Sequence, residues 1–538
     1  MSFIKKYHYP LIYLLVTSAL LFFFSDASFS ISLRICTEVF LICIFVCAIS
    51  NNYLRSTLWI IYNLVLSSQI NSVISTGEFL IPLTILNIEE ASAVGNEALF
   101  KIILVTILYF SLSLLIIKQK KLKLGRFLIA PVIISLLFTG PIRSSISTLY
   151  YTYKQVSYHP SYNYFDLDQN FLKHKFYDTS TLPDSLQHIK KSPNIIVIFS
   201  EGLSSIVIDK NNNKALNLTP NISSAYEEGF YVDNYFNHTA ATFRGLRGQL
   251  ISGYQYRDGI TKQNNGLDQI NKEKVKKMYS GKLISLPEIL NNHGYHTYFI
   301  SSTERDSNLN SLLASMPFHK VFGMEDFNWS VNDRMSDKAS FKALSDIVSS
   351  MDTNDQPFFI GIYPSGTHHG LDSPDTAYMD GKNSYYNKFH NLDEQIGSFI
   401  SWFRSSKYYD DTILILTGDH STFPTPEFKK SFGTNNSFFV DKIPFMILGK
   451  SIKHDVFDAK GKNSLSLAPT ILNIIGINAG DNYFLGCSLF DIDCNNPLSN
   501  ISAIGDIFFS INPDSKGNYT VTPLEDHHLI RLFYHISG

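Results

Sequence analysis

Several polar residues with catalytic chemistry directly follow apolar runs in this sequence. Asp419 and His420 come after TILILTG, and Glu201 follows the β-branched run of NIIVIFS. A carboxylate and an imidazole at the exit of a buried strand are able to bind one divalent cation, and Glu201 would be a third ligand. The alternative interpretation is that Asp419 caps the next helix and that Glu201 is a solvated loop residue.

A hydroxyl group for the same site is expected between residues 237 and 254, where Thr239 and Thr242 are the candidates. Helical spacing after Thr242 predicts that this residue lies near a helix N-terminus, where backbone N–H groups favour anions such as phosphate. Coordination to a metal is one way to activate a threonine hydroxyl as a nucleophile. Alternatively, Thr242 only caps that helix. Arg244 and Arg247 either steady an anionic substrate or face water.

These residues need a scaffold that brings strand ends together, and the chain after residue 190 has the pattern of one. Short apolar runs alternate with stretches of helical spacing, and the runs lie at residues 195–199, 296–302, 357–366, 412–420 and 443–449. This alternation predicts an α/β domain with a mostly parallel central sheet. Because parallel strands end at the same edge, Glu201, Asp419 with His420, and His368 with His369 are expected to converge.

The first 145 residues have a different composition. Five apolar runs, each near the length of a spanning helix, lie at about residues 9–24, 35–50, 56–72, 99–117 and 126–141. Lys and Arg gather before the first run and at 118–126, so the positive-inside rule places these segments in the cytoplasm. The sequence therefore predicts a five-helix transmembrane domain over 1–145, a juxtamembrane linker over 146–190, and an extracytoplasmic catalytic domain over 191–538.

Charge and cysteine content narrow the choice of partners and compartment. The net charge is −2 over 538 residues, so bulk electrostatics do not indicate any particular partner, and no nucleic-acid partner is expected. Cys487 and Cys494 are the only cysteines in the predicted exported part. A disulfide between them would suit an oxidising compartment, but the sequence leaves this pairing open.

The combination of motifs resembles a known family. Five spans, a strand followed by Glu201, Thr242, T-H-H at 367–369 and G-D-H at 418–420 are similar to the lipoteichoic acid synthase and phosphoglycerol transferase family, within the alkaline phosphatase and sulfatase superfamily. The resemblance covers nearly the whole chain. It includes LSLAPTILNIIGI at 465–477, which is similar to a late helix of the superfamily.

The resemblance implies a ligand set for one divalent cation. Glu201, Thr242, Asp419 and His420 would hold Mn²⁺ or Mg²⁺, and Thr242 would be the nucleophile. The oxygen-rich set with one histidine favours these ions over Zn²⁺.

Substrate contacts are also implied by the resemblance. The T-H-x-G pattern makes His368 the expected substrate-phosphate histidine, with His369 second. The family's substrate loop corresponds loosely to residues 302–311, where Arg305 and Asn308 are the expected contacts, although its Trp-x-Arg pattern is absent. Arg244 is a further expected contact.

The function implied by the resemblance is head-group transfer at a bacterial inner membrane, by a multi-pass enzyme whose catalytic domain is periplasmic or extracellular. The expected donor is a phospholipid, with phosphatidylglycerol first, and the acceptor is a cell-envelope glycan or polymer. Thr242 would take the head group as phosphothreonine and pass it to an acceptor hydroxyl. A phosphoethanolamine transferase is the main alternative. A sulfatase would need C/S-x-P-x-R, which is absent after Thr242; a phosphodiesterase and a non-catalytic interaction protein are further alternatives.

Overall fold

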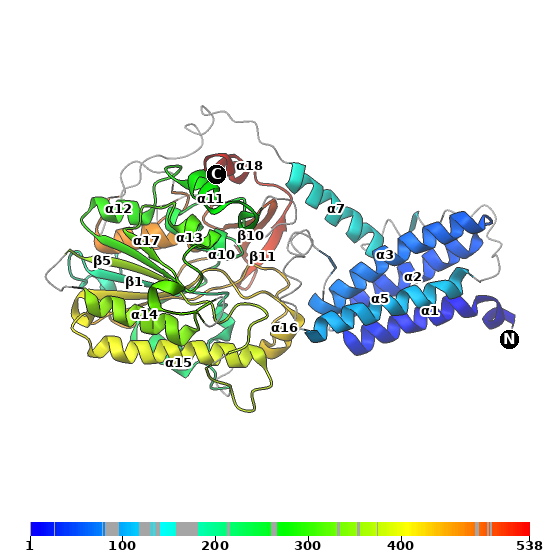
Figure 1. The fold of residues 1–538 in the computed structure, drawn as a ribbon, viewed down its shortest axis with the longest axis horizontal. Coiled ribbons are helices and arrows are strands. Elements are labelled where there is room, and N and C mark those ends of the chain that lie inside the picture. The colour runs from blue at the N-terminus through cyan, green and yellow to red at the C-terminus, as the bar shows by residue number, and fades with distance from the viewer. Residues whose placement is uncertain are drawn as a thin grey trace. The chain divides into compact units, whose positions relative to one another are not determined.

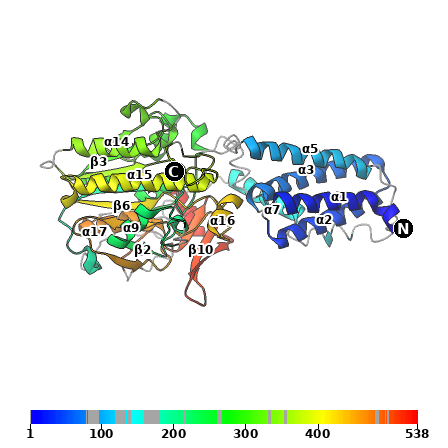
Figure 2. The ribbon, with the colours of Figure 1, turned by 90° about the horizontal axis from the view of Figure 1, so that it is seen from below.

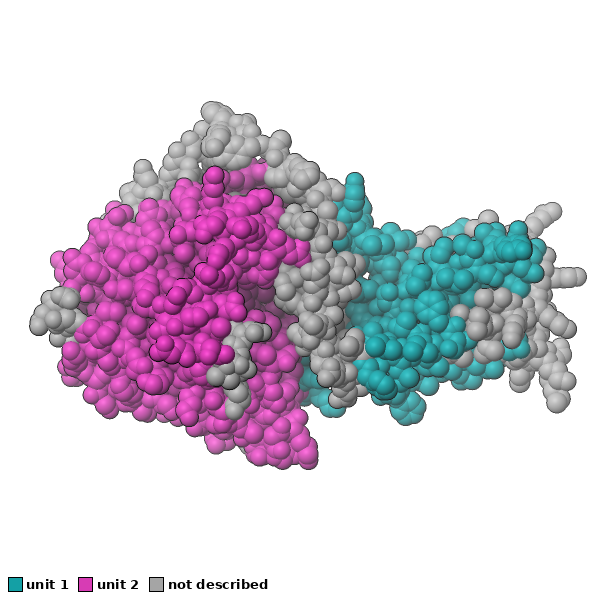
Figure 3. All heavy atoms as spheres, in the orientation of Figure 1, with its two compact units in different colours: residues 1–158, 424–430 teal, residues 159–423, 431–538 magenta. Residues whose placement is uncertain are grey.

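The structure is a computed structural model. It describes residues 2–25, 27–77, 79–80, 96–117, 130, 133–134, 140–157, 181–211, 216–259, 266–330, 334–351, 356–373, 375–478, 484–491, 494 and 498–537. The chain forms two compact units, residues 1–158 with 424–430 and residues 159–423 with 431–538 (Figure 3). The predicted functional boundaries at residues 145 and 190 stay predictions.

The first unit is helical. Its helices are α1 (Ser2–Phe24), α2 (Phe29–Ala48), α3 (Asn52–Thr76), α5 (Asn96–Ile117) and α7 (Pro141–Ser157) (Figure 1). Among the described residues, Phe29–Ala48 and Asn52–Ile74 are long and apolar enough to cross a membrane, whereas the apolar helical stretches Tyr9–Phe24 and Ile102–Ser111 are shorter. Two candidate spans are therefore found where five were predicted. Most of the fifth predicted span, 126–141, lies outside the described residues.

The expected linker contains more regular structure than its sequence indicates. Helix α7 covers the first part of it, through Ser157, and a 3₁₀ turn at Asp184–Leu186 lies near its end. Residues 158–180 lie outside the described residues. We expected no periodicity here because the stretch mixes Tyr, Lys, His and Asp.

The second unit contains an eight-stranded sheet, which confirms the predicted α/β fold. Its strands are β1 (Asn194–Ser200), β2 (Phe230–Asp233), β3 (His296–Ser301), β4 (Lys320–Phe322), β5 (Phe358–Tyr363), β6 (Thr412–Gly418), β7 (Phe445–Leu448) and β8 (Asp455–Asp458). Their order is β4-β3-β5-β1-β6-β7-β2-β8. Only β7 among these strands runs antiparallel to its neighbours, so the sheet is mostly parallel, as predicted.

Helices cover both faces of this sheet. Helices α14 (Asp337–Ser350) and α15 (Ser384–Ser405) pack side by side on one face, with α9 (Pro220–Glu228) against α15 (Figures 1 and 2). The other face carries α10 (Thr242–Ile251), α12 (Leu286–Asn292), α13 (Asn308–Leu313) and α17 (Leu467–Ile475). Because β1 is buried on both faces, Ile195, Val197 and Phe199 join the core shared with these helices.

A smaller antiparallel sheet follows the predicted elements. It has the order β11-β10-β9, formed by β9 (Ile501–Ile504), β10 (Ile507–Pro513) and β11 (Tyr519–Leu524). Helix α18 (His528–Ser537) packs with it through Phe508 and Phe533. Helix α11 (Lys272–Tyr279) also belongs to the second unit, whereas α16 (Pro426–Phe432) begins in the segment 424–430 that is assigned to the first unit. Cys487 and Cys494 form a disulfide, with their Cα atoms 6.3 Å apart.

Candidate metal-dependent active site

The register between β1 and β6 brings the first three candidate residues together. Ser200 pairs with Gly418 at the ends of these parallel strands, and the Asp419 N–H donates to the Ser200 carbonyl at 3.1 Å. Glu201 and His420 continue from these ends, and both are buried with Asp419. The predicted convergence at the carboxyl edge of the sheet is therefore observed for these residues.

Backbone N–H groups fix the Asp419 carboxylate. Its Oδ1 accepts from the N–H of Gly202 and from the N–H of His420, each at 2.8 Å. Gly202 has a φ of +52°, a conformation that costs glycine little, and this turn directs its N–H toward Asp419. The other oxygen, Oδ2, has no hydrogen-bond partner among the described residues.

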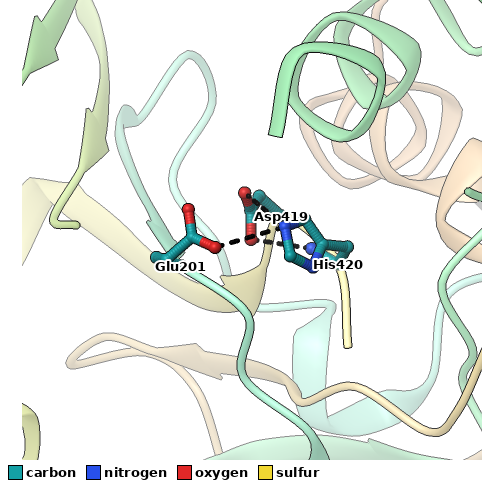
Figure 4. A group of neighbouring side chains, drawn as sticks. All are labelled: Glu201, Asp419 and His420. Carbon is teal, nitrogen blue, oxygen red and sulfur yellow. Dashed lines mark hydrogen bonds and ion pairs between the residues drawn. The ribbon is translucent and has the colours of Figure 1, made fainter. Parts of the chain in front are cut away.

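The imidazole of His420 faces both carboxylates. Its Nδ1 lies 2.7 Å from the Ser421 carbonyl, which only accepts, so Nδ1 carries a proton. Its Nε2 lies 3.3 Å from Glu201 Oε1 and 3.4 Å from Asp419 Oδ2, and the three side chains point toward one another (Figure 4). No hydrogen bond satisfies this Nε2 within the described part of the chain.

The electrostatics of this cluster favour a positive charge at its centre. Burial, reinforced by Glu201, raises the pKa of Asp419 to about 8. Burial alone would lower the pKa of His420, but Asp419 and Glu201 raise it to about 10. Two buried carboxylates are costly unless a cation lies beside them. Without a metal ion, the protonated imidazole of His420 supplies this positive charge.

The donor set fits one divalent cation. One ligand atom from each of Glu201, Asp419 and His420 lies within 4.8 Å of the others. Asp419 Oδ2 and His420 Nε2 are buried and otherwise unsatisfied, as expected of atoms whose partner is an ion. Two carboxylates with one imidazole and no thiolate are ligands that suit Mn²⁺ or Mg²⁺.

Thr242 lies beside this cluster as the first residue of α10. Its Oγ1 donates to Glu201 Oε2 at 2.9 Å, and its side chain is partly exposed. Helix α10 is held against the end of β6 because Gln249 Nε2 donates to the carbonyls of Gly418 and Asp419, at 3.0 and 3.1 Å. A Cβ at Gly245 would lie 2.4 Å from the Asp419 carbonyl oxygen, so only glycine permits this approach.

Thr239, the other hydroxyl candidate, lies elsewhere. It is buried, and its Oγ1 donates to the Ala503 carbonyl at 2.7 Å. The structure therefore selects Thr242 as the hydroxyl beside the cluster.

Tyr363, at the end of β5, is a member of the site that sequence reasoning missed. Its hydroxyl makes a short hydrogen bond to Glu201 Oε2, and it lies 3.5 Å from Thr242 Oγ1. Burial raises the pKa of Tyr363, so the phenol stays protonated and donates. Thr242 and Tyr363 thus share one carboxylate oxygen, which leaves Glu201 Oε1 directed at His420.

The loop after β5 carries the two predicted histidines. Partly buried His368 has Nδ1 2.9 Å from the His369 carbonyl, and it interacts electrostatically with Glu201. Burial lowers the pKa of His368, an effect that Glu201 opposes. His369 faces away to Tyr385, whose hydroxyl lies 3.4 Å from its Nδ1, and to the Phe423 ring.

Two basic residues near this loop were also not predicted. Buried Lys388 of α15 donates to the His368 carbonyl at 3.3 Å and lies 4.1 Å from the centre of the Tyr385 ring. Arg334 forms an antiparallel backbone bridge with Thr303, just after β3. The pKa of His368 is lowered first by burial and, to a smaller extent, by the positive charge of Arg334, while Glu201 raises it. In the sequence, Lys388 reads as an ordinary helix residue and Arg334 as part of a loop without a pattern.

The structure does not bring the remaining predicted contacts into this group. Arg244 donates to the carbonyls of Tyr256 and Ala240 at 3.0 and 2.8 Å. Exposed Arg305 forms an ion pair with Asp326 at 3.1 Å. Asn308 donates to two backbone carbonyls, those of Leu267 and Ile270, at 2.6 and 2.9 Å. Each side chain therefore has a local structural role, and substrate binding by them stays a prediction.

Sequence comparisons support the resemblance seen in the motifs. The family model described as "Sulfatase" matches residues 193–477, more than half of the chain. Lipoteichoic acid synthase 2 of Bacillus subtilis (strain 168) is 24% identical over 318 residues, 55% of this chain and 47% of that protein. Phosphoglycerol transferase I of Escherichia coli (strain SMS-3-5 / SECEC) is 24% identical over 349 residues, 59% and 41% of the two chains. The chain thus spans less than half the length of these relatives.

Solved structures show the same fold. An alkaline phosphatase superfamily protein from Vibrio parahaemolyticus has a TM-score of 0.52 and 18% identity, covering 69% of this chain and 90% of that one. The lipoteichoic acid synthase LtaP from Listeria monocytogenes has a TM-score of 0.50 and 17% identity, covering 67% and 92%. The predicted resemblance to lipoteichoic acid synthases and phosphoglycerol transferases is therefore confirmed.

Mn²⁺ or Mg²⁺ is expected to raise the melting temperature of the purified chain. An ion that binds only the folded state adds about 2.7 kcal/mol of stability at a hundredfold excess over its Kd. Asp419→Asn should lose most of the shift, measured by differential scanning fluorimetry with and without chelator. Asp337→Asn is the matched control, because Asp337 is also buried but accepts from the Gly366 N–H at 2.8 Å. Equal shifts in both variants would contradict a cation site at Asp419.

Proposed function

Because this chain belongs to the sulfatase family, we propose that it is a membrane-bound phosphoglycerol transferase that moves a phospholipid head group to a hydroxyl of a cell-envelope glycan or polymer. The observation that carries the proposal is the position of Thr242. Its hydroxyl lies at the N-terminus of α10, 2.9 Å from Glu201 and beside the Asp419–His420 pair. This arrangement suits a threonine nucleophile at a phosphorus atom.

The type of nucleophile favours transfer over sulfate-ester hydrolysis. A sulfatase needs a Cys or Ser that is converted to formylglycine within C/S-x-P-x-R, whereas T-F-R-G-L occupies residues 242–246 here. The names of the similar proteins, lipoteichoic acid synthase and phosphoglycerol transferase, support glycerol phosphate as the transferred group. We propose phosphatidylglycerol as the donor.

The reaction would proceed by double displacement. Thr242 Oγ1 attacks the phosphorus of the donor phosphodiester, and the bond from phosphorus to the diacylglycerol oxygen breaks. Diacylglycerol leaves as an alcohol with the proton that Thr242 gives up, and the head group stays on Thr242 as a phosphothreonine. An acceptor hydroxyl then attacks the same phosphorus, the bond to Thr242 Oγ1 breaks, and the acceptor's proton returns to Thr242 Oγ1 to restore its hydroxyl. The covalent intermediate splits one difficult transfer into two easier ones.

The side chains around Thr242 have separate roles in this scheme. Glu201, Thr242, Asp419 and His420 would hold one Mn²⁺ or Mg²⁺, which when bound supplies positive charge that stabilises the transferring phosphoryl group. Glu201 Oε2 orients the Thr242 hydroxyl. Neutral His368, with Nδ1 directed at a carbonyl, has Nε2 free to take the acceptor's proton.

We also propose a multi-pass topology in a bacterial inner membrane, with the catalytic unit on the periplasmic or extracellular side. The candidate spans at Phe29–Ala48 and Asn52–Ile74 and the basic residues at 118–126 support it. The Cys487–Cys494 disulfide fits an oxidising compartment. This location gives access to a lipid donor and to an envelope acceptor.

The donor is testable with the purified full-length chain, Mn²⁺ and a phosphatidylglycerol that carries a fluorescent acyl chain. We expect diacylglycerol release by the wild type and none by Thr242→Ala. Thr239→Ala is the matched control, because it removes a buried hydroxyl that bonds to Ala503 rather than to the cluster. Release from the phosphatidylethanolamine analogue instead would favour a phosphoethanolamine transferase. Full activity of Thr242→Ala would exclude the proposed nucleophile.

Tyr363→Phe should lower the rate of diacylglycerol release by about one to two powers of ten. A hydrogen bond to a charged group contributes roughly 1.5–3 kcal/mol, and this one holds Glu201 in the orientation that serves Thr242. The cation-induced rise in melting temperature should persist. Tyr235→Phe is the control, because its buried hydroxyl has no hydrogen-bond partner in the described part of the chain. Wild-type turnover in Tyr363→Phe would remove Tyr363 from the mechanism.

His368→Gln should slow the second displacement more than the first. Loss of a general base costs about 10²–10⁴-fold in rate, so phosphothreonine at position 242 should accumulate after a normal burst of diacylglycerol. Intact-protein mass spectrometry measures the adduct. The neighbouring His369→Gln should not accumulate it, since His369 is directed at Tyr385. Slowing of the burst itself would instead assign His368 to the first displacement.

A further inference from the structure

Helix α7 buries two hydroxyl side chains and exposes several apolar ones. Thr148 and Thr152 are buried, at 4% and 6% exposure. Four exposed apolar or aromatic side chains follow at helical spacing and form one stripe: Ile146 (55%), Leu149 (61%), Tyr150 (54%) and Tyr153 (70%). Arg143 and Ser147 are exposed as well. A helix on the surface of a water-soluble domain has the opposite arrangement.

Polar contacts fix which face of α7 turns inward. The Glu38 carboxylate of α2 accepts from the Ile142 N–H at 3.1 Å, which caps the first turn of the helix. Gln69 of α3 donates to Ser145 Oγ at 2.7 Å, and Thr148 Oγ1 donates to the Leu80 carbonyl at 2.6 Å. The orientation of the apolar stripe (Ile146, Leu149, Tyr150 and Tyr153) therefore follows from the packing of α7 on α2 and α3.

The neighbouring candidate span also exposes apolar side chains. Helix α3 buries apolar residues such as Trp59 and Leu66 together with Asn63 and Ser67, while Ile61 and Leu64 are exposed by about half. Helix α14 of the other unit shows ordinary polarity, since it buries apolar side chains, Phe341, Leu344 and Val348, and exposes Lys342. The difference between these helices indicates that the medium around the first unit is apolar.

We propose that the apolar stripe of α7 lies in the interfacial region of a phospholipid bilayer. Seventeen residues span about 25 Å, less than the roughly 30 Å of a hydrocarbon core. Tyr150 and Tyr153 combine an apolar ring with a hydroxyl, which suits the headgroup level, and exposed Arg143 lies at the start of the helix. Glu38, which has the N-terminus of α7 as its partner, fixes the depth of this helix relative to α2.

The occupant of this surface is lipid rather than a second copy of the chain. Helices α2 and α3, the two candidate spans, also have exposed apolar side chains like those of the stripe. Those side chains, such as Phe29, Leu33 and Leu64, need an apolar solvent along the helix length, and a bilayer supplies it for all three helices. The proposal does not depend on the reaction proposed above.

Photo-crosslinking of the full chain in phosphatidylglycerol–phosphatidylethanolamine nanodiscs tests this surface. The photoreactive residue p-benzoylphenylalanine is installed at position 149 or 153 of α7. Control positions are 456, where Val456 is an exposed apolar residue of β8, and 342 on α14. After irradiation, intact-mass analysis distinguishes lipid adducts from protein adducts.

We expect lipid adducts at positions 149 and 153 and no lipid adducts at positions 342 and 456. Adducts between two copies of the chain at 149 and 153 would overturn the proposal and assign the stripe to a dimer interface. Equal lipid adducts at all four positions, or none at 149 and 153, would also overturn it, because either result means that the stripe has no preferred contact with the bilayer.

Discussion

The burial of two carboxylates at adjacent strand ends is the constraint on which the rest of the site depends. The β1–β6 register places Glu201 and Asp419 at the same edge, and neither side chain reaches water. Like charges in a low-dielectric position are unfavourable unless a cation is present, and His420 is directed at both of them. In addition, two backbone N–H groups donate hydrogen bonds to Asp419 Oδ1. A site that favours positive charge in this way would be the physical basis of the proposed cation-dependent reaction at this edge.

The same strand end also determines the position of Thr242, the proposed nucleophile. Helix α10 approaches the strand end closely because Gly245 has no side chain and because Gln249 donates to the carbonyls of Gly418 and Asp419. This contact determines where Thr242 begins the helix. The Thr242 hydroxyl and the Tyr363 phenol then share Glu201 Oε2, so one carboxylate oxygen serves the hydroxyls and the other faces the imidazole. Positioning by a rigid strand and a pinned helix is more exact than positioning by loops.

The sequence was informative where burial imposes a pattern. The runs at 195–199, 357–366 and 412–420 each contain consecutive apolar residues, the pattern of a strand that is covered on both faces. Tyr363 was missed because it lies within such a run, and only the register shows that its hydroxyl meets Glu201. Arg305 and Asn308 were selected from a loop, where spacing carries no information about direction, and both side chains bond locally. The antiparallel direction of β7 and the small sheet of β9–β11 were not predicted from the sequence.

We propose that the first unit is surrounded by lipid and the second by water, and this difference explains why the first unit was harder to predict. Hydropathy identifies α2 and α3 because each contains a long window of high mean hydropathy with few charged residues. Helix α7 carries Ser, Thr and Tyr, and its sequence is typical of a polar linker. The relation of α7 to its surroundings depends on which of its faces is buried, and the contacts with Glu38 and Gln69 determine that face. A polar helix with its hydroxyls turned inward lowers the cost of leaving backbone and side-chain donors in an apolar medium. Composition alone therefore underestimates how much of this chain is adapted to lipid.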